Sequence, residues 1–180
     1  SRGHVRVYAY SSGSWTQLGS DIDGEATGDY SGNSVSINSD GDRVAIGAGN
    51  NDGTTGNSND NRGHVRVYEY SGGSWSQVGS DIDGEAALDR SGNSVSINSA
   101  GDRVAIGAEG NDDGPGDDAG HVRVYEYSGG SWTQLGSVID GEAASDQFGD
   151  SVSLDSDGGR VDIGAVVYTN LRAHETSLHL

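Results

Sequence analysis

Three near-identical copies of one segment follow one another along the chain, and they constrain the fold more than any other feature. The stretch GHVRVYAYSSGSWTQLGSDIDGEA starts at Gly3, and close copies of it start at Gly63 and Gly120. A second block, SGNSVSINSDGDRVAIGA in its first copy from Ser31, follows each of them. A unit of about 60 residues cannot bury an apolar face alone, so neighbouring copies must stack on one another.

Each copy carries the pattern of strands and turns. Short runs of β-branched and aromatic residues alternate with clusters of Gly, Ser, Asn and Asp, which is typical of β-structure. We expect four strands per copy, and in one copy they cover residues 93–98, 103–108, 121–127 and 132–139. Large and small residues alternate within them, as in Val104-Ala105-Ile106-Gly107, which fits a sheet covered on both faces.

The repeat and the strand pattern together predict an all-β fold. Four-stranded antiparallel sheets that stack radially give a β-propeller, and blades of about 40–60 residues are typical of that architecture. The chain would then hold about three blades. A β-solenoid is the alternative architecture, although its rungs are usually shorter than this unit.

The charge balance excludes some classes of partner. The chain has 28 acidic residues against 10 basic ones, for a formal net charge of −18. Such a field repels nucleic acid and anionic membrane surfaces, and it favours cations or basic partners. No run approaches the length of a transmembrane helix, so we expect neither nucleic-acid binding nor membrane insertion. The chain opens inside a repeat, which predicts a piece of a longer protein.

The second block and the strand that follows it resemble the FG-GAP repeat of integrin α-subunit-like propellers. The resemblance rests on Phe148-Gly149-Asp150-Ser151-Val152, on the Ile-Gly-Ala triplets that end at Ala48, Ala108 and Ala165, and on the recurring Gly-His-Val-Arg-Val-Tyr strand. It implies tandem propeller repeats over residues 1–165. Blades are expected at about 28–84 and 88–141, with half-blades at 1–27 and 142–165 and an irregular C-terminal tail at 166–180.

The resemblance also implies a function without catalysis. Propellers of this family serve as binding or scaffolding modules of extracellular or cell-surface proteins, so we expect adhesion or protein–protein recognition through the loops. Two chains of three blades would close one six-bladed ring and leave no bare sheet edge, which predicts a homodimer. The alternative function is a carbohydrate-binding propeller lectin with one aromatic site per blade.

The lectin alternative depends on aromatic residues that recur once per copy. Trp15, Trp75 and Trp132 each open an expected fourth strand, and Tyr70 and Tyr127 lie near two of them. In a binding role, each Trp and its Tyr would form a stacking platform for a sugar ring. In a structural role, each Trp would pack between blades or cover a sheet edge.

A second candidate site consists of acidic residues at alternating positions in the connections between blades. Carboxylates arranged in this way can converge on a divalent cation such as Ca²⁺. The metal-site candidates are Asp21, Asp23, Glu25, Asp29, Asp81, Asp83, Glu85 and Asp89. The structural alternative is that these acids cap backbone N–H groups in a solvated connection. On that interpretation the chain has no cofactor, and on the other it binds Ca²⁺.

Ca²⁺ loops of the FG-GAP family lie elsewhere, between the first two strands of a blade. Here that loop is shortened to Asn38-Ser39-Asp40-Gly41-Asp42 and is followed by Arg43. Too few oxygens remain for the six to eight ligands that Ca²⁺ takes. We therefore expect that the family's own metal site is lost.

Repetition argues against an enzyme. A histidine and an arginine recur together in every copy, as in His64 and Arg66, and a catalytic pair would not normally be repeated in this way, so we expect a structural role. No nucleophile–base–acid set or Gly-x-Ser-x-Gly elbow is present. Asp162 replaces the Ala of the other copies on the small-residue face, so we expect the last blade to be the least regular.

Overall fold

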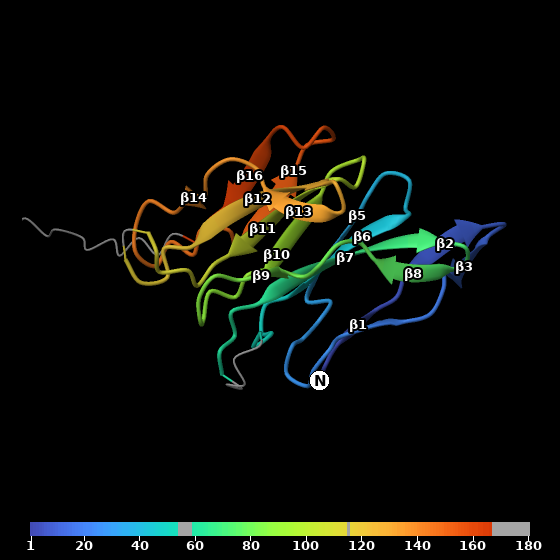
Figure 1. The fold of residues 1–180 in the computed structure, drawn as a ribbon, viewed down its shortest axis with the longest axis horizontal. Helices are drawn as coiled ribbons and strands as arrows, with labels where there is room; N and C mark the ends of the chain where they lie inside the picture. Colours follow the sequence, from blue (N-terminus) through green and yellow to red (C-terminus); the bar gives the residue numbers. More distant parts are fainter. Residues whose placement is uncertain (54–58, 115, 167–180) are drawn as a thin grey trace, which may run out of the picture.

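The chain folds into stacked antiparallel β-sheets (Figure 1). The computed structural model describes residues 1–53, 59–114 and 116–166, and within these ranges the chain is all-β without a helix. Accordingly, no helix in this part of the chain is long and apolar enough to cross a membrane. The all-β prediction is confirmed, whereas the expected tail lies outside the described residues except for Val166.

Two larger sheets share one topology. The first contains β5 (Ser34–Ile37), β6 (Arg43–Ala48), β7 (His64–Ser71), β8 (Ser74–Gln77) and β9 (Ile82–Asp83). The second contains β10 (Ser94–Ile97), β11 (Arg103–Ala108), β12 (His121–Ser128), β13 (Ser131–Gln134) and β14 (Ile139–Asp140). In each, four strands follow one another in sequence order, and the short last strand pairs with the third.

Three two-stranded pairings flank these sheets. They are β1 (His4–Val5) with β4 (Ile22–Asp23), β2 (Tyr8–Ser11) with β3 (Ser14–Gln17), and β15 (Ser151–Leu154) with β16 (Val161–Gly164). In the repeat, β1–β4 correspond to the third and fourth strands of a copy, and β15–β16 to the first and second. We call the contact of β1–β4 with the first sheet the first junction, and that between the two larger sheets the second junction.

The expected fourth strand is interrupted rather than continuous. The sequence predicted one strand over 132–139, but β13 ends at Gln134 and β14 begins at Ile139, and both pair with β12. The corresponding break in the first sheet contains Gly79 with a φ of 75°, which side chains rarely allow. A Cβ on Gly79 would also lie 2.8 Å from Cδ1 of Trp132. The break therefore makes room for a tryptophan of the next copy.

The first strands of successive copies are joined by serine hydroxyls. Ser94 Oγ donates to the carbonyl oxygen of Gly149 at 2.6 Å, and the backbone N–H of Ile97 donates to Ser36 Oγ at 3.1 Å. The N–H of Leu154 meets Ser96 Oγ in the same way at 2.9 Å. The small-residue face predicted from the sequence is thus the face where neighbouring strands approach closely enough for such bonds.

The apolar core lies between sheets, and the same positions are bare where no neighbour is described. Val95 and Ile97 are 8% and 6% exposed in the second junction. Their equivalents on β5, Val35 and Ile37, are 52% and 48% exposed. The exposure of these side chains therefore depends on the first two strands of a preceding copy, which lie beside Val95 and Ile97 but are not described beside Val35 and Ile37. Burial in this chain comes from stacking, as the repeat requires.

The last hairpin keeps the common register. Val152 pairs with Ile163 in β15–β16 as Val95 pairs with Ile106 in β10–β11. It is shorter, because β16 has 4 residues where β11 has 6. Asp162, opposite Ser153, is exposed, since no described sheet covers its face.

The burial pattern predicts where large side chains matter. Replacing Ile106, which is 1% exposed in the second junction, by alanine should lower the free energy of unfolding by about 3 kcal/mol. Replacing the exposed Thr133 of β13 by alanine should change it by less than about 1 kcal/mol. Urea unfolding of both variants checks the prediction, which equal losses would contradict.

Candidate binding site at the sheet junctions

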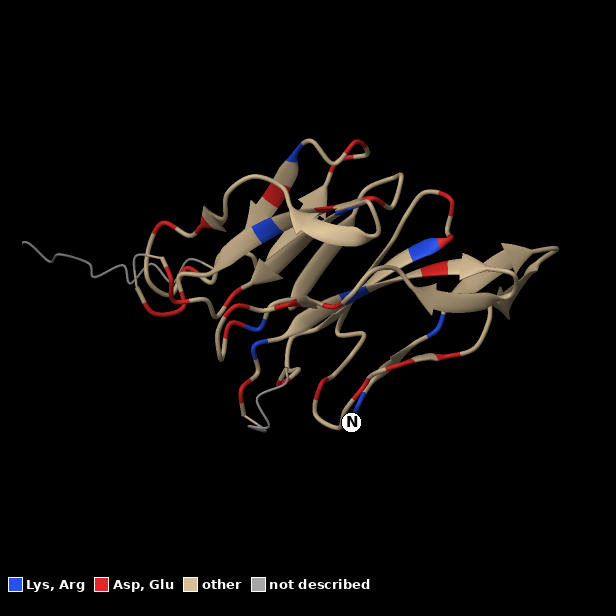
Figure 2. Ribbon diagram, in the orientation of Figure 1, with Lys and Arg blue, Asp and Glu red and all other residues tan. Residues whose placement is uncertain are grey.

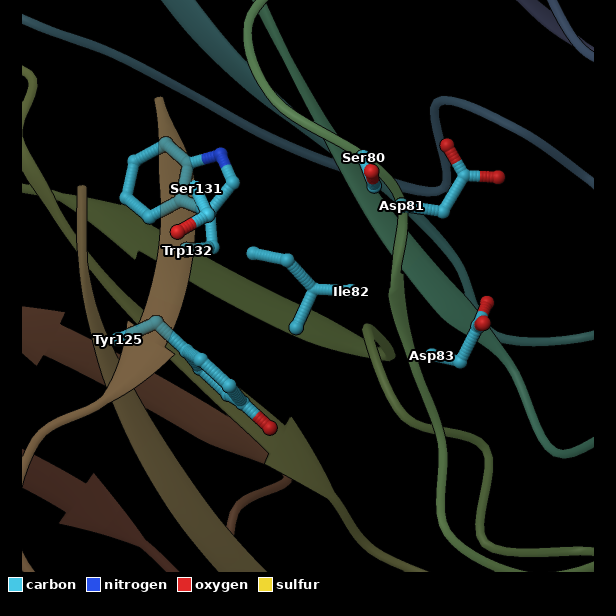
Figure 3. A pocket seen from close by; sticks show the side chains of 7 residues that line it. All are labelled: Ser80, Asp81, Ile82, Asp83, Tyr125, Ser131 and Trp132. Carbon is cyan, nitrogen blue, oxygen red and sulfur yellow. The ribbon is translucent and has the colours of Figure 1, made fainter. Parts of the chain in front are cut away.

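The predicted aromatic and acidic residues meet at the junctions, on opposite sides of one strand segment. Successive side chains of a strand point to opposite faces, and Asp81, Ile82 and Asp83 follow this rule. In Figure 3, Ile82 points toward Trp132 and Tyr125, whereas the carboxyl groups of Asp81 and Asp83 point away from the two rings. The structure therefore divides the candidates into an aromatic side and an acidic side.

On the aromatic side, tryptophans tie one sheet to the preceding copy. Trp132 Nε1 donates a hydrogen bond to the carbonyl oxygen of Val78, and Trp75 Nε1 to that of Leu18, both at 2.8 Å. Both indoles are half-buried, whereas Trp15, with no preceding sheet described, is 67% exposed. Packing against the preceding copy is the structural role that we gave, from the sequence, as the alternative to sugar binding for these tryptophans.

Each tryptophan also meets its expected tyrosine. The ring centroids of Tyr70 and Trp75 lie 5.1 Å apart and those of Tyr127 and Trp132 lie 5.2 Å apart, with the ring planes tilted by 46° and 48°. These distances are in the range where aromatic pairs attract one another. The pairing is therefore a feature of every copy, whether or not a sugar stacks on it.

A small cavity opens beside the aromatic side of both junctions. At the second junction it measures about 280 Å³ and is lined by Ser80, Asp81, Ile82, Asp83, Tyr125, Ser131 and Trp132 (Figure 3). The equivalent residues of the preceding copies line a cavity of about 290 Å³ at the first junction. A repeated cavity of this kind is a candidate for a small ligand.

On the acidic side, a buried arginine joins neighbouring copies. Arg66 is 5% exposed and donates from Nη2 to the carbonyl oxygen of Asp23 at 3.0 Å, with Glu25 Oε1 lying 3.7 Å from Nη1. Its guanidinium carbon lies 5.6 Å from the ring centroid of Tyr68, within the range of a cation–π contact. Arg123 repeats this arrangement at the second junction with Asp83, Glu85 and Tyr125.

The first copy shows what the arginine does without a preceding sheet. Arg6 instead binds Asp21 of its own copy through two hydrogen bonds, at 2.8 and 2.7 Å. This pair, together with a bond from Gln17, holds the pKa of the Asp21 carboxyl well below its usual range. A stacked sheet thus redirects the arginine from its own copy to the neighbouring one.

The buried histidines of β7 and β12 lie beside the arginines. The side chains of His64 and His121 are 2% and 1% exposed. Burial is the main cause that lowers the pKa of both imidazoles, and Arg66 and Arg123 lower it further. Glu25, Asp81 and His64 offer ligand atoms that all lie within 4.8 Å of one another.

Two further acidic candidates, Asp29 and Asp89, cap backbone groups. The carboxylate oxygen Oδ2 of Asp29 accepts the N–H of Ala26 at 2.8 Å, and that of Asp89 accepts the N–H of Ala86 at 2.9 Å. Both carboxylates are 2% exposed. Asp21 and Asp29 therefore do not converge with Glu25 on one point, and the carboxylates that do come together belong to different copies.

Sequence reasoning missed this arrangement across the junction. It considered the acids of each connection as one group and assigned His64 a separate structural role. The signal was the recurrence of the histidine and of Glu25 at fixed repeat positions, but only stacking shows that one copy's Glu25 meets the next copy's histidine.

The shortened loop between the first two strands is held by Asn38, whose side-chain oxygen accepts the backbone N–H groups of Asp42 and Arg43.

Comparisons with known proteins add no assignment. No protein-family model matches the chain, and no curated protein matches it. The residues at the junctions are therefore the basis on which its function is inferred.

The buried histidines predict a pH dependence of stability. Because the folded pKa of His64 and His121 lies below the ordinary value of 6.5, the unfolded chain binds more protons just below that pH. The free energy of unfolding should be greatest above about pH 7 and should fall as the pH drops through 6.5.

Urea unfolding at pH 7.5 and 5.5 measures this effect. The double variant His64→Gln/His121→Gln should lose less stability between the two pH values than the unaltered chain does, even if it is less stable at both. Equal losses in the two proteins would show that the histidines do not cause the dependence.

Proposed function

We propose that the chain is a non-enzymatic recognition and scaffolding module, an FG-GAP-like propeller segment that binds a basic protein partner along an acidic edge of its sheets. The observation that carries the proposal is that exposed carboxylates from consecutive connections share one edge of the stack. We define this acidic loop edge by its exposed members, which are Asp83, Glu85, Asp112, Asp113, Asp117, Asp118, Asp140 and Glu142.

Backbone hydrogen bonds hold the loops of this edge together. The N–H of Ser145 donates to the carbonyl oxygen of Asp117 at 2.9 Å, and that of Gln147 to Asp118 at 3.0 Å. The N–H of Gly110 reaches the carbonyl oxygen of Asp89 at 3.2 Å, which joins the preceding connection to the same edge. Figure 2 shows Asp and Glu spread along these loops.

Some acids at the other end of the sheets are paired with arginine, whereas the acids of the loop edge are mostly without such a partner. Glu69 and Glu126, near the hairpin end, each bind an arginine at 2.8 Å. Among the described residues of the acidic loop edge, the side-chain carboxylate of Glu85 alone has an arginine within ion-pair distance, Arg123 at 3.4 Å. Carboxylates that lack an arginine partner along one edge attract a basic surface and speed its association.

The scaffolding part of the proposal concerns a second copy of the chain. A mostly apolar cavity of about 280 Å³ lies beside β5. Its lining consists of Val5, Val7, Tyr8, Val35, Ile37 and Val44, together with Arg6 and Ser36. In the second junction the strands of the preceding sheet cover the residues equivalent to Val35 and Ile37. We propose that β15 and β16 of a second copy cover them here, so that two chains close a six-bladed ring.

The register of the larger sheets specifies how that composite sheet would pair. Since Val104 pairs with Tyr125 and Gly107 with Val122, Val161 of one chain would lie opposite Tyr8 of the other. Asp162 would then occupy a position where Ala45 and Ala105 are fully buried. A buried carboxylate opposes this contact, so replacing Asp162 by alanine strengthens it.

Binding of nona-arginine, measured by fluorescence anisotropy, tests the recognition proposal. The unaltered chain should bind this peptide with an affinity that falls as salt rises, and should not bind nona-glutamate. Asp117→Asn/Glu142→Gln on the acidic loop edge should weaken binding about fivefold, since each exposed charge contributes roughly 0.2–1 kcal/mol.

The matched control is Asp40→Asn/Asp157→Asn, which changes the net charge equally at the exposed hairpin end. It should leave the affinity nearly unchanged. Equal weakening by both variants would mean that the peptide senses only net charge, and binding of a glycan but not of the peptide would favour the lectin alternative.

A further inference from the structure

We propose that the first junction holds one divalent transition-metal ion of the Zn²⁺ type, bound by Glu25, His64 and Asp81. This inference is independent of the proposed recognition of a basic partner. The three side chains come from two copies of the repeat, since Glu25 follows β4 whereas His64 begins β7 and Asp81 precedes β9. A bound ion would therefore link the two sheets of the junction.

The buried imidazole supports a metal more than an ion pair. Nδ1 of His64 lies 3.8 Å from Asp81 Oδ2 and 3.9 Å from Glu25 Oε2, which is beyond hydrogen-bonding distance of both. The side chain is 2% exposed, so Nδ1 faces these two carboxylates with little access to water. Burial also favours the neutral imidazole, the form in which the nitrogen can bind a metal.

The spacing of the ligand atoms suits a small ion after a modest adjustment. Tetrahedral Zn²⁺ with bonds of about 2.1 Å places its ligand atoms roughly 3.4 Å apart. Glu25 and Asp81 are 49% and 31% exposed, so their carboxylates can turn toward the histidine while it stays in place. One nitrogen and two oxygens leave a fourth position for water, as in Zn²⁺ sites with three protein ligands.

The charges that surround the site also permit a cation. Asp83, which pairs with His64 across β7 and β9, adds a third carboxylate. Arg66 contributes one positive charge at 3.7 Å from the other oxygen of Glu25. The cluster of three carboxylates and one guanidinium is therefore negative without a metal, and a divalent ion compensates that charge.

The second junction provides a comparison within the same chain. There His121 meets Glu85 at 4.0 Å, but Val138 stands at the repeat position of Asp81. In the first copy, Asp21 is present, but Arg6 binds its carboxylate. The described residues include no glutamate of a preceding copy that could join it. The described residues thus complete the set of three ligands at the first junction, whereas each of the other two copies lacks one.

Calorimetric titration of the unaltered chain with ZnCl₂ tests the proposal through matched variants. Asp81→Val should remove one equivalent of bound Zn²⁺, and the third copy already folds with Val at this position. Glu25→Gln should weaken the same equivalent at least about tenfold. Asp21→Val makes the same change in the first copy and should leave the stoichiometry unchanged. Comparing the two variants therefore separates zinc bound at the first junction from zinc bound elsewhere on the chain.

Val138→Asp is the decisive gain-of-site variant, because it should add one equivalent at the second junction. Zn²⁺ should also raise the midpoint of thermal unfolding of the unaltered chain, and it should do so less for Asp81→Val. The proposal is overturned if Asp81→Val binds as much zinc as the unaltered chain, or if Asp21→Val loses the same equivalent.

Discussion

Each larger sheet of this protein has a face that only a neighbouring copy of the repeat covers, and the rest of the structure depends on that contact. The second junction combines a buried aliphatic layer, an indole hydrogen bond from Trp132 and the guanidinium of Arg123. All three reach residues of the preceding copy. Since a sheet with one bare apolar face is not stable by itself, the repeat folds as a stack or not at all.

The sequence alone was sufficient to predict the features of the fold that depend on the local pattern of residues. The alternation in Val104-Ala105-Ile106 predicted a sheet covered on both faces, and the turns were correctly placed between the expected strands. The break in the fourth strand was not predictable, because Gly79 makes room for Trp132, which lies far along the chain. Nor could the acids be sorted, because Asp89 caps Ala86 within its own connection, whereas Glu25 meets His64 only when two copies stack.

The stacking of one copy on the next accounts for both the partner recognition and the metal binding that we propose. Ordered stacking brings equivalent connections to one edge, where their carboxylates add up to an extended acidic surface. It also brings side chains of two copies together, which creates the set of Glu25, His64 and Asp81. The departures of individual copies then carry functional meaning, because Val138 removes a ligand at one junction and Asp162 alters the face on which a second copy would lie.

We propose that a junction forms wherever the repeat leaves a bare face, including the face of Val35 and Ile37. Light scattering coupled to size-exclusion chromatography tests it most directly. We predict a mass of about twice that of the 18.5 kDa chain, reduced to the mass of one chain when Val35 and Ile37 are both replaced by glutamate. A mass of 18.5 kDa at every concentration would contradict the closure of two chains into one ring.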